Sequence, residues 1–313
     1  MRVKVIINPA AGQAEPILSV LNDVFGPAGI EWDVAITHKS GDGVTAARAA
    51  AGQGYDLIGA YGGDGSVAEV VAGLAVGGPP ILLLPGGTGN ALAADLGIPP
   101  GLAEAAALAV DGASEVRKVD VGRSGKQWFV LRLTTGFEAE MVSAATRVMK
   151  DRFGWLAYAF TGLQAISDAP MVTYSMTIDG KSVECDGLAA LVANSASVGV
   201  SGLRIADDVD VSDGLLDVVV VQRADLPGLI GSAADAAQGQ QPRMMSRWRG
   251  KKIRLETTLP QAVLADGEDA GLTPVDVTVV PGAVGVLVPK QPGSLGVSAA
   301  TSRVPRKREA PKR

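Results

Sequence analysis

The chain has 313 residues, a length typical of about two domains, and its 47% of apolar residues can build a buried core, which excludes a wholly disordered protein. Its single cysteine, Cys185, excludes an intrachain disulfide, and with His38 as the only histidine it excludes a zinc site of His and Cys within one chain. Any Ser-His-Asp chemistry would have to use His38. The net charge is −5, and because residues 301–313 carry +5, the rest carries −10, which argues against a general nucleic-acid binder.

Strand and helix signals alternate over the first 120 residues. Short apolar runs predict strands at Val3–Ile7, Glu31–Thr37, Asp56–Tyr61 and Ile81–Leu84. Apolar residues at helical spacing predict helices at Pro16–Phe25, Gly43–Gln53, Val67–Ala75, from about Asn90, and at Leu102–Val110. Such alternation implies a parallel sheet with right-handed crossovers, which binds ligands at the carboxyl ends of its strands.

After Asp120 the pattern changes to short valine-rich runs separated by Gly, Asp and Pro turns. These predict strands at Gln127–Thr134, Val172–Ile178, Gly187–Ala193, Leu215–Gln222, Lys252–Glu256, Asp276–Val280 and Val284–Val288. One long helical stretch, from about Glu140 to Ile166, interrupts them. The second half is therefore predicted to be a mainly antiparallel β domain.

No apolar stretch reaches the roughly 18 residues that a membrane span requires. The opening MRVKVII is too short for the apolar core of a signal peptide and is predicted to be a strand. We therefore expect a cytoplasmic protein, with at most peripheral contact with the inner face of the membrane. The basic end of the chain is expected to be a solvated terminus, or alternatively to touch an anionic surface.

The segment Gly62–Ser66 (GGDGS) joins a predicted strand to a helix. Its glycines let the main chain approach a charged group, and its amides face an anion. Asp64 has the wrong charge to bind phosphate directly, so it would hold a cation that bridges phosphates. The structural alternative is a plain turn capped by Asp64, and Ser66 with Glu69 fits a capping box.

A second glycine-rich segment, Pro85–Asn90 (PGGTGN), also joins a strand to a helix. Two such loops at neighbouring strand ends can enclose one polyphosphate, with Thr88 and Asn90 supplying hydroxyl and amide partners. The alternative is a helix start capped by Asn90. No Gly-Lys-Ser/Thr follows either loop, and neither fits Gly-x-Gly-x-x-Gly, so neither a Walker A nor a Rossmann site is supported.

Two long segments, YGGDGSVAEVVAGL and LLPGGTGNALAADLGIP, resemble the catalytic domain of the diacylglycerol kinase and sphingosine kinase superfamily, whose bacterial members are soluble lipid kinases. VIINPAAGQ is similar to the family's first strand and Asn-Pro turn. Three more segments resemble strands of its second domain in the same order: TTGFEAEMV, LVANSASVGVSGLRIADDVDVSDGLLDVVVV and ADGEDAGLTPVDVTVVPGAVGVLVP. The resemblance covers roughly residues 3–289.

The resemblance implies an α/β protein with its active site in the cleft between two domains. Residues 1–122 would form an N-terminal three-layer α/β nucleotide-binding domain, and residues 123–289 a C-terminal mainly antiparallel β domain that takes the lipid. Residues 290–313 would form a flexible basic tail that contains Pro and Gly.

The implied reaction transfers the γ-phosphoryl group of ATP to a lipid hydroxyl, with ATP and Mg²⁺ as cofactors. Asp64 would organise Mg²⁺. The residues implied to bind the nucleotide lie in the two loops, the first turn and the end of the second strand: Asn8, Gly12, Thr37, Gly62, Gly63, Asp64, Gly65, Ser66, Gly87, Thr88, Gly89 and Asn90.

The triplet Asp266-Gly267-Glu268 matches the family's catalytic triplet, and the match places Asp266 as the general base on the acceptor hydroxyl, with Glu268 beside it. Because phosphoryl transfer has a loose transition state, a carboxylate needs only to orient the hydroxyl and accept its proton late. Without the family, the triplet would be interpreted as a hairpin turn.

Two further acidic positions follow from the resemblance. Asp213 would bind a structural Mg²⁺ together with the backbone carbonyls of Asp210 and Leu215, and a site of oxygen ligands suits that ion. Asp120 matches an acidic position that the family links to its active-site network. The alternative for Asp120 is a surface carboxylate that ends a strand.

The chain departs from the family at Asn90-Ala91, where many diacylglycerol kinases have Asn-Asp, and at Ser66, where Thr is usual. Asn-Ala is like the sphingosine kinase branch and leaves the acceptor open. The aromatic segment Phe153–Ile166 would line an acyl channel, lie on the membrane or pack between the domains. The segment Arg243–Lys252 would rest on anionic headgroups or form a solvated strand edge.

Four functions stay open. The first is a kinase of diacylglycerol that makes phosphatidate, and the second is a kinase of sphingosine or ceramide. The third is an NAD kinase, which shares the GGDG loop but would need an Asn-x-Gly-x-Leu-Gly-Phe type of second segment. The fourth is a non-catalytic lipid- or nucleotide-binding regulator, against which the intact Asp64 and Asp266 count. The expected partners are ATP, a lipid at a membrane surface and a second copy in a homodimer, and no nucleic acid.

Overall fold

The computed structural model describes residues 1–11, 15–75, 77–110, 112, 114–136, 171–197, 205–206, 208–222 and 245–290. The predicted helix at 140–166, the aromatic segment, Gly12 and the basic tail lie outside these residues. In the described part, no helix is long and apolar enough to cross a bilayer.

Four parallel strands form the centre of the first domain, in the order β2-β1-β3-β4. They are β1 (Arg2–Ile7), β2 (Glu31–Ile36), β3 (Leu57–Gly62) and β4 (Ile81–Pro85). Every residue of β3 and β4 is buried, as expected for parallel strands that are covered on both faces.

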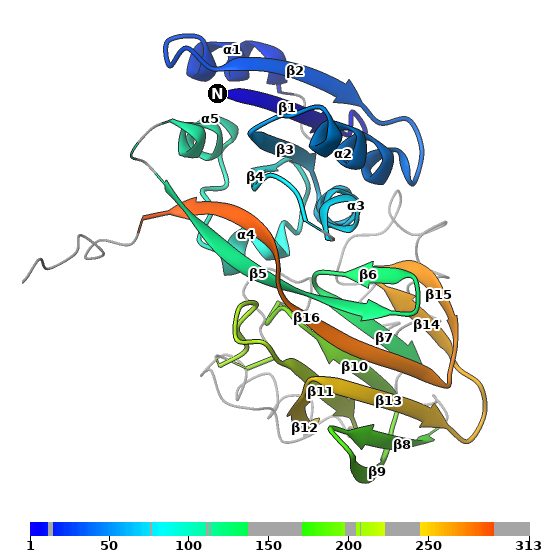
Figure 1. Ribbon diagram of the computed structural model, residues 1–313. Helices are drawn as coiled ribbons and strands as arrows, with labels where there is room; N and C mark the ends of the chain where they lie inside the picture. Colours follow the sequence, from blue (N-terminus) through cyan, green and yellow to red (C-terminus); the bar gives the residue numbers. More distant parts are fainter. Residues whose placement is uncertain are drawn as a thin grey trace, which may run out of the picture.

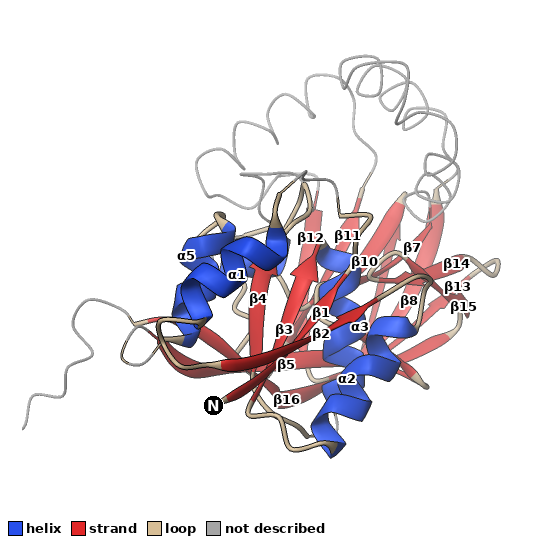
Figure 2. Cartoon of the chain, turned by 90° about the horizontal axis from the view of Figure 1, so that it is seen from above, coloured by secondary structure: helices blue, strands red, loops and turns tan. Residues whose placement is uncertain are grey.

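Helices cover both faces of this sheet, so the predicted three-layer α/β architecture is confirmed (Figure 2). Helices α1 (Ile17–Phe25) and α5 (Leu102–Ala106) pack together on one face, and α2 (Asp42–Gly52) and α3 (Asp64–Leu74) pack together on the other. The short helix α4 (Ala91–Asp95) follows β4, and a 3₁₀ turn, η1 (Ala107–Ala109), ends the predicted helix at Leu102–Val110 early.

Two long strands run through both domains (Figure 1). The antiparallel strands β5 (Ser114–Ser124) and β16 (Val275–Pro289) pair along their lengths, with a bulge between Val280 and Val284. One end of β16 pairs with β13 in the second domain, and the other end reaches β4 through Val286. The runs predicted as two strands at 276–280 and 284–288 are thus one bulged strand. The division into residues 1–122 and 123–289 stays a prediction.

The second domain consists of two antiparallel sheets that enclose one apolar core. One sheet continues from β16 through β13 (Lys252–Thr257) and β8 (Val172–Ile178) to β9 (Lys181–Gly187). The other has the order β12-β11-β10-β7-β14-β15, with bounds Met245–Gly250, Leu216–Val221, Ala189–Ala193, Arg132–Gly136, Ala262–Ala265 and Glu268–Leu272. The predicted antiparallel β domain is confirmed.

One predicted strand is broken where it meets the cleft. The run Gln127–Thr134 forms β6 (Gln127–Phe129) and β7, with a corner at residues 130–131 between them. The corner amides bond to the Asp266 carboxylate rather than to a neighbouring strand, so a contact far along the chain overrides the local strand preference.

Candidate active site

The first glycine loop is fastened to the end of β1. Gly63 is the N-cap of α3, which begins at Asp64, earlier than the sequence predicted. The Asn8 side-chain amide donates a hydrogen bond to Ser66 Oγ at 3.0 Å, and Asn8 Oδ1 accepts the Ala10 amide at 3.0 Å. A Cβ on Gly62 would collide with Ser66 Oγ, so only glycine leaves room for this link.

The second glycine loop lies directly against the first. A Cβ on Gly87 would lie 2.5 Å from the Gly63 Cα, so the two main chains touch. Asn90 adopts a left-handed φ of 48°, and its side chain bonds both to the Gly87 amide, at 3.1 Å, and to the Gly87 carbonyl, at 2.8 Å. Its side chain therefore closes the loop on itself. The structural alternative, in which this side chain caps α4, is wrong, because Asn90 makes no side-chain capping hydrogen bond. The prediction that two neighbouring loops come together is confirmed.

Asp64 connects the two loops through its side chain. Its Oδ1 accepts the Ala91 amide, at the start of α4, at 2.7 Å. A Cβ on Gly89 would lie 2.6 Å from its Oδ2. Burial raises the pKa of this carboxyl, although the Ala91 hydrogen bond acts to lower it. Asp64 is thus a capping residue, as the structural alternative proposed, but it caps α4 and not the helix in which it lies, α3.

Both loops border a cavity of about 630 Å³ at the carboxyl ends of β1 and β3. Of the residues predicted to bind nucleotide, six line it: Asn8, Thr37, Gly63, Gly65, Ser66 and Gly87. Gly62, Asp64, Gly89 and Asn90 support the loops as described above, and Thr88 is exposed beside them. A cavity of this size can hold a nucleotide-sized ligand.

A second wall of this cavity comes from the turn that follows β2. Thr37, His38 and Lys39 line it, and Asp42 accepts the amides of His38, at 2.9 Å, and Lys39, at 3.2 Å. The His38 hydrogen bond lowers the pKa of Asp42. His38 and Lys39 were not predicted to line the site, although they follow Thr37 in the sequence.

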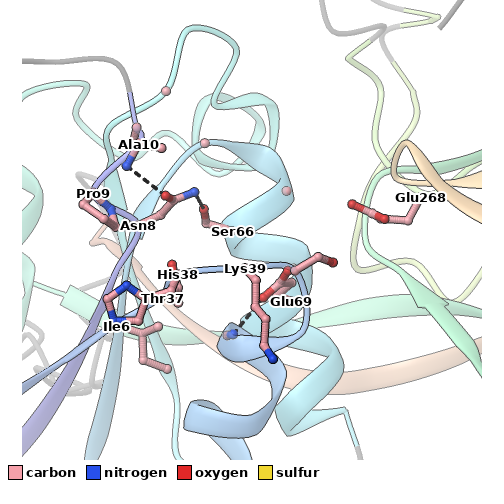
Figure 3. Close-up of a pocket in the computed structure, with 16 residues that line it drawn as sticks. Ile6, Asn8, Pro9, Ala10, Thr37, His38, Lys39, Ser66, Glu69 and Glu268 are labelled. Carbon is pink, nitrogen blue, oxygen red and sulfur yellow. Dashed lines mark hydrogen bonds between the residues drawn. The ribbon is translucent and has the colours of Figure 1, made fainter. Parts of the chain in front are cut away.

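Glu69 fastens this turn to α3. Its two carboxylate oxygens accept the amides of Gly41, at 2.9 Å, and Gly43, at 2.8 Å. The predicted Ser66–Glu69 capping box is therefore wrong, because Glu69 binds the start of α2 and Ser66 binds Asn8. Glu69 lies in the cavity wall (Figure 3). Its place one helical turn after Ser66 was the signal that could have revealed it.

The second domain supplies the opposite wall through Glu268. Figure 3 shows its carboxylate pointing into the cavity from the side opposite Asn8 and Ser66. Glu268 is exposed at the start of β15. An adjoining cavity of about 300 Å³ shares Glu268 and Gly65, and is lined further by Trp128 and Asp266. One cleft thus brings the first glycine loop together with the Asp266–Glu268 triplet.

Asp266 lies beside Glu268 but is engaged by main chain. Its Oδ2 accepts the Val130 amide at 2.7 Å, and its Oδ1 accepts the amides of Leu131, at 3.0 Å, and Arg132, at 2.9 Å. Asp266 has a left-handed φ of 48°. Burial raises its pKa to about 6, with the three amide bonds acting in the other direction. Three of its roughly four acceptor sites are therefore occupied by amides of the β6–β7 corner.

Asp120 and Asp213 lie away from the cavity. Asp120 is only 2% exposed, so the surface alternative is wrong, and its carboxylate accepts the amides of Gly214, at 2.5 Å, and Gly282, at 2.7 Å. Asp213 accepts the Leu215 amide at 3.0 Å and pairs with Arg249.

The described part of the basic segment, from Met245 onward, forms β12, an edge strand, as the structural alternative had it. Arg247 pairs with Asp208 and Asp217, and Arg249 pairs with Asp213 and Asp217. These two side chains are therefore held by carboxylates of the protein and not extended toward a headgroup layer.

Family models match both halves of the chain. A family model described as the diacylglycerol kinase catalytic domain matches residues 2–124, and one described as a YegS C-terminal NAD kinase β-sandwich-like domain matches residues 132–288. A diacylglycerol kinase from Mycobacterium tuberculosis is 32% identical over 77% of this chain and 80% of its own length.

Two further comparisons cover different shares of the relatives. An uncharacterized protein from Synechocystis is 32% identical over 76% of this chain, which spans 56% of that protein's length. A solved structure from Bacillus anthracis, assigned to the diacylglycerol kinases, superimposes with a TM-score of 0.77 at 25% identity and covers 92% of this chain and 96% of its own.

Proposed function

This chain belongs to the diacylglycerol kinase family of ATP-dependent lipid kinases, and we propose that it phosphorylates the free hydroxyl of diacylglycerol to give phosphatidate. The observation that carries the proposal is one cavity with two glycine loops on one wall and Glu268 on the other. Such a cavity can hold a triphosphate between main-chain amides and a carboxylate.

The phosphate-binding wall consists mainly of backbone. Gly63 and Gly87 bring their main chains within contact, and the start of α3 adds the amides of a helix N-terminus. Asn8 and Thr37 add side-chain donors at the edge of the cavity. These groups bind phosphate by hydrogen bonds, and a Cβ on either glycine would narrow the space.

Asp64 is not among the residues that line the cavity, and its Oδ1 accepts the Ala91 amide, but it stands between Gly63 and Gly65, which do line the cavity. We propose that it holds Mg²⁺ with the phosphates. A carboxylate is a ligand that this ion prefers, and Mg²⁺ in kinases is commonly bound by one or two carboxylates together with phosphate oxygens. The described residues contain no group of three or more acidic, His or Cys side chains that could form a cage by themselves. When bound, Mg²⁺ would neutralise charge on the phosphates.

Glu268 is the better candidate for the general base, and this changes the role assigned to Asp266. The acceptor oxygen would form a bond to the γ-phosphorus while the bond to the β,γ-bridging oxygen breaks and ADP leaves. The hydroxyl proton would go to the Glu268 carboxylate, which faces the cavity. Both oxygens of Asp266 hold corner amides, so we propose that Asp266 positions the turn that carries Glu268.

The test is a labelled-ATP assay over diacylglycerol, monoacylglycerol, sphingosine, ceramide, undecaprenol and NAD. We expect the label mainly in phosphatidate, and its loss in the Glu268→Gln variant. Label in sphingosine or ceramide phosphate would move the assignment to the other lipid branch. Transfer to NAD alone, or tight ATP binding without any labelled product, would overturn the proposal.

The acceptor would come from a membrane surface, so the assay is best run on mixed vesicles. Contact of this chain with the membrane and its assembly as a homodimer stay predictions. Vesicle co-sedimentation and light scattering test them separately from the chemistry.

A further inference from the structure

The loop before β11, at residues 208–215, is held by arginine side chains where the sequence predicted a structural Mg²⁺. Asp213 Oδ1 accepts the Leu215 amide at 3.0 Å, and Asp213 Oδ2 pairs with Nη2 of Arg249, from β12. The Asp210 carbonyl accepts the Asp213 amide at 3.4 Å. We propose that the Arg249 guanidinium replaces the divalent cation here, so that this loop binds no structural Mg²⁺.

Arg249 is one member of a compact ionic network. Its Nε lies 3.3 Å from Asp217 Oδ1, which also lies 2.5 Å from Arg247 Nη2. Arg247 Nη1 pairs with Asp208 Oδ1 at 2.5 Å. The side chains of Asp217 and Arg247 are 3% and 11% exposed. The carboxylates of Asp208, Asp213 and Asp217 therefore each have an arginine partner already.

The side chain of Asp210, whose backbone carbonyl was the predicted ligand, is also engaged. Asp210 Oδ1 accepts the Ser212 amide at 3.0 Å and lies 2.5 Å from Arg117 Nη2, on β5. Asp120 accepts the amide of Gly214, near the end of the loop.

Physical chemistry favours the guanidinium over the ion in this arrangement. Mg²⁺ requires octahedral oxygen ligands at about 2.0–2.1 Å, whereas both oxygens of Asp213 already face N–H donors. A dication would also lie close to Arg249 and repel it. Arg is always charged, and its planar fork fits carboxylates. The side chains of Arg249 and Asp213 are 32% and 27% exposed, but Arg249 also faces Asp217, which is 3% exposed. Displacing Arg249 would remove one of the two cationic partners of this buried carboxylate, which is costly.

The consequence is a second domain whose stability does not depend on Mg²⁺, whichever lipid the enzyme phosphorylates. The test measures the melting temperature of the full chain without nucleotide, in excess EDTA and in excess MgCl₂. We expect the two wild-type values to agree within about 1 °C, because an ion that does not bind the native state cannot stabilise it.

The Arg249→Gln variant sharpens the test, because it frees Asp213. We expect its melting temperature in EDTA to fall by about 5 °C, and MgCl₂ to restore part of the loss. The matched control is Arg254→Gln, which removes an exposed arginine paired with Glu256 and Asp276 and should gain no Mg²⁺ dependence.

The wild-type result decides the proposal even if Arg249→Gln does not fold. A melting temperature of the wild type that rises with MgCl₂, and does not rise in Asp213→Asn, would overturn the proposal, because the ion would then act through the Asp213 carboxylate. A rise that persists in Asp213→Asn would place the ion elsewhere and leave this loop free of metal, as proposed.

Discussion

The two walls of the cleft are built in different ways. On the wall that we propose to bind phosphate, glycine main chains touch, so the geometry depends on the absence of side chains at Gly63 and Gly87. On the opposite wall, Asp266 holds the turn of Glu268 through three hydrogen bonds from one carboxylate. The first wall should therefore be sensitive to added volume and the second to lost charge. Asp64 combines both features, because it is a charged side chain that joins two glycine loops.

The largest effect is expected from Asp64→Asn. The change removes the charge proposed to hold Mg²⁺ with the phosphates and weakens the acceptor for the Ala91 amide. We expect kcat to fall on the order of 10³-fold, as when a principal electrostatic group is lost. Steady-state kinetics with varied MgCl₂ measures it. Asp23→Asn, at an exposed position of α1, is the matched control and should behave as wild type. Near-normal kcat in Asp64→Asn would remove the metal role.

Gly87→Ala tests the phosphate-binding wall by volume alone. The new methyl carbon would lie 2.5 Å from the Gly63 Cα, so the two loops must move apart. We expect kcat/KM for ATP to fall about 100-fold, because small displacements of positioning groups are costly. Gly52→Ala is the control, since a Cβ there meets nothing within 4 Å. Equal kinetics for the two variants would show that the loops are not in the tight contact described.

Asp266→Asn tests the opposite wall through the charge and the hydrogen bonds of the Asp266 carboxylate. An asparagine keeps one acceptor oxygen but presents an NH₂ group to an amide donor. We expect a loss of about tenfold in kcat with little change in KM for ATP, together with a lower melting temperature, because the corner at residues 130–132 loosens. Glu115→Gln, at an exposed position of β5, is the control. A loss of kcat as large as that of Glu268→Gln, with an unchanged melting temperature, would instead restore Asp266 as the base.

The smallest expected effect is a pH dependence of stability that comes from Asp266. Burial raises its pKa from 3.8 to about 6 in the folded protein. Between these values the native state binds more protons than the unfolded state, so the contribution of Asp266 to the free energy of unfolding falls as pH rises. Denaturant unfolding across this range should show the wild type losing stability relative to Asp266→Asn. A constant difference between the two proteins would mean that the three amide bonds offset burial.

Local patterns were enough to predict two glycine loops at neighbouring strand ends. Both glycine loops, and the strands that end at them, are contiguous in sequence, so their periodicity and turn residues reveal them. The opposite wall depends on contacts that join distant segments: Asp266 and Leu131 are 135 positions apart. The break in the strand predicted at 127–134 was missed for the same reason, because it depends on bonds to the distant Asp266.

Pairing across the domains was also beyond local patterns. Nothing in the composition of residues 275–289 shows that one strand serves both sheets, because its two halves are separated by a Pro-Gly pair that is typical of a turn. The partners of Asp213 were hidden for a related reason. Arg249 lies 36 positions further along the chain and meets Asp213 only when β11 and β12 pair.

The most direct test of the shared cleft is Glu268→Gln, with kcat on diacylglycerol vesicles and the Kd for ATP both measured. If Glu268 accepts the hydroxyl proton opposite the glycine loops, kcat should fall about 100-fold or more while the Kd for ATP stays near the wild-type value. An unchanged kcat would contradict the account, because the second domain would then supply no carboxylate to the reaction.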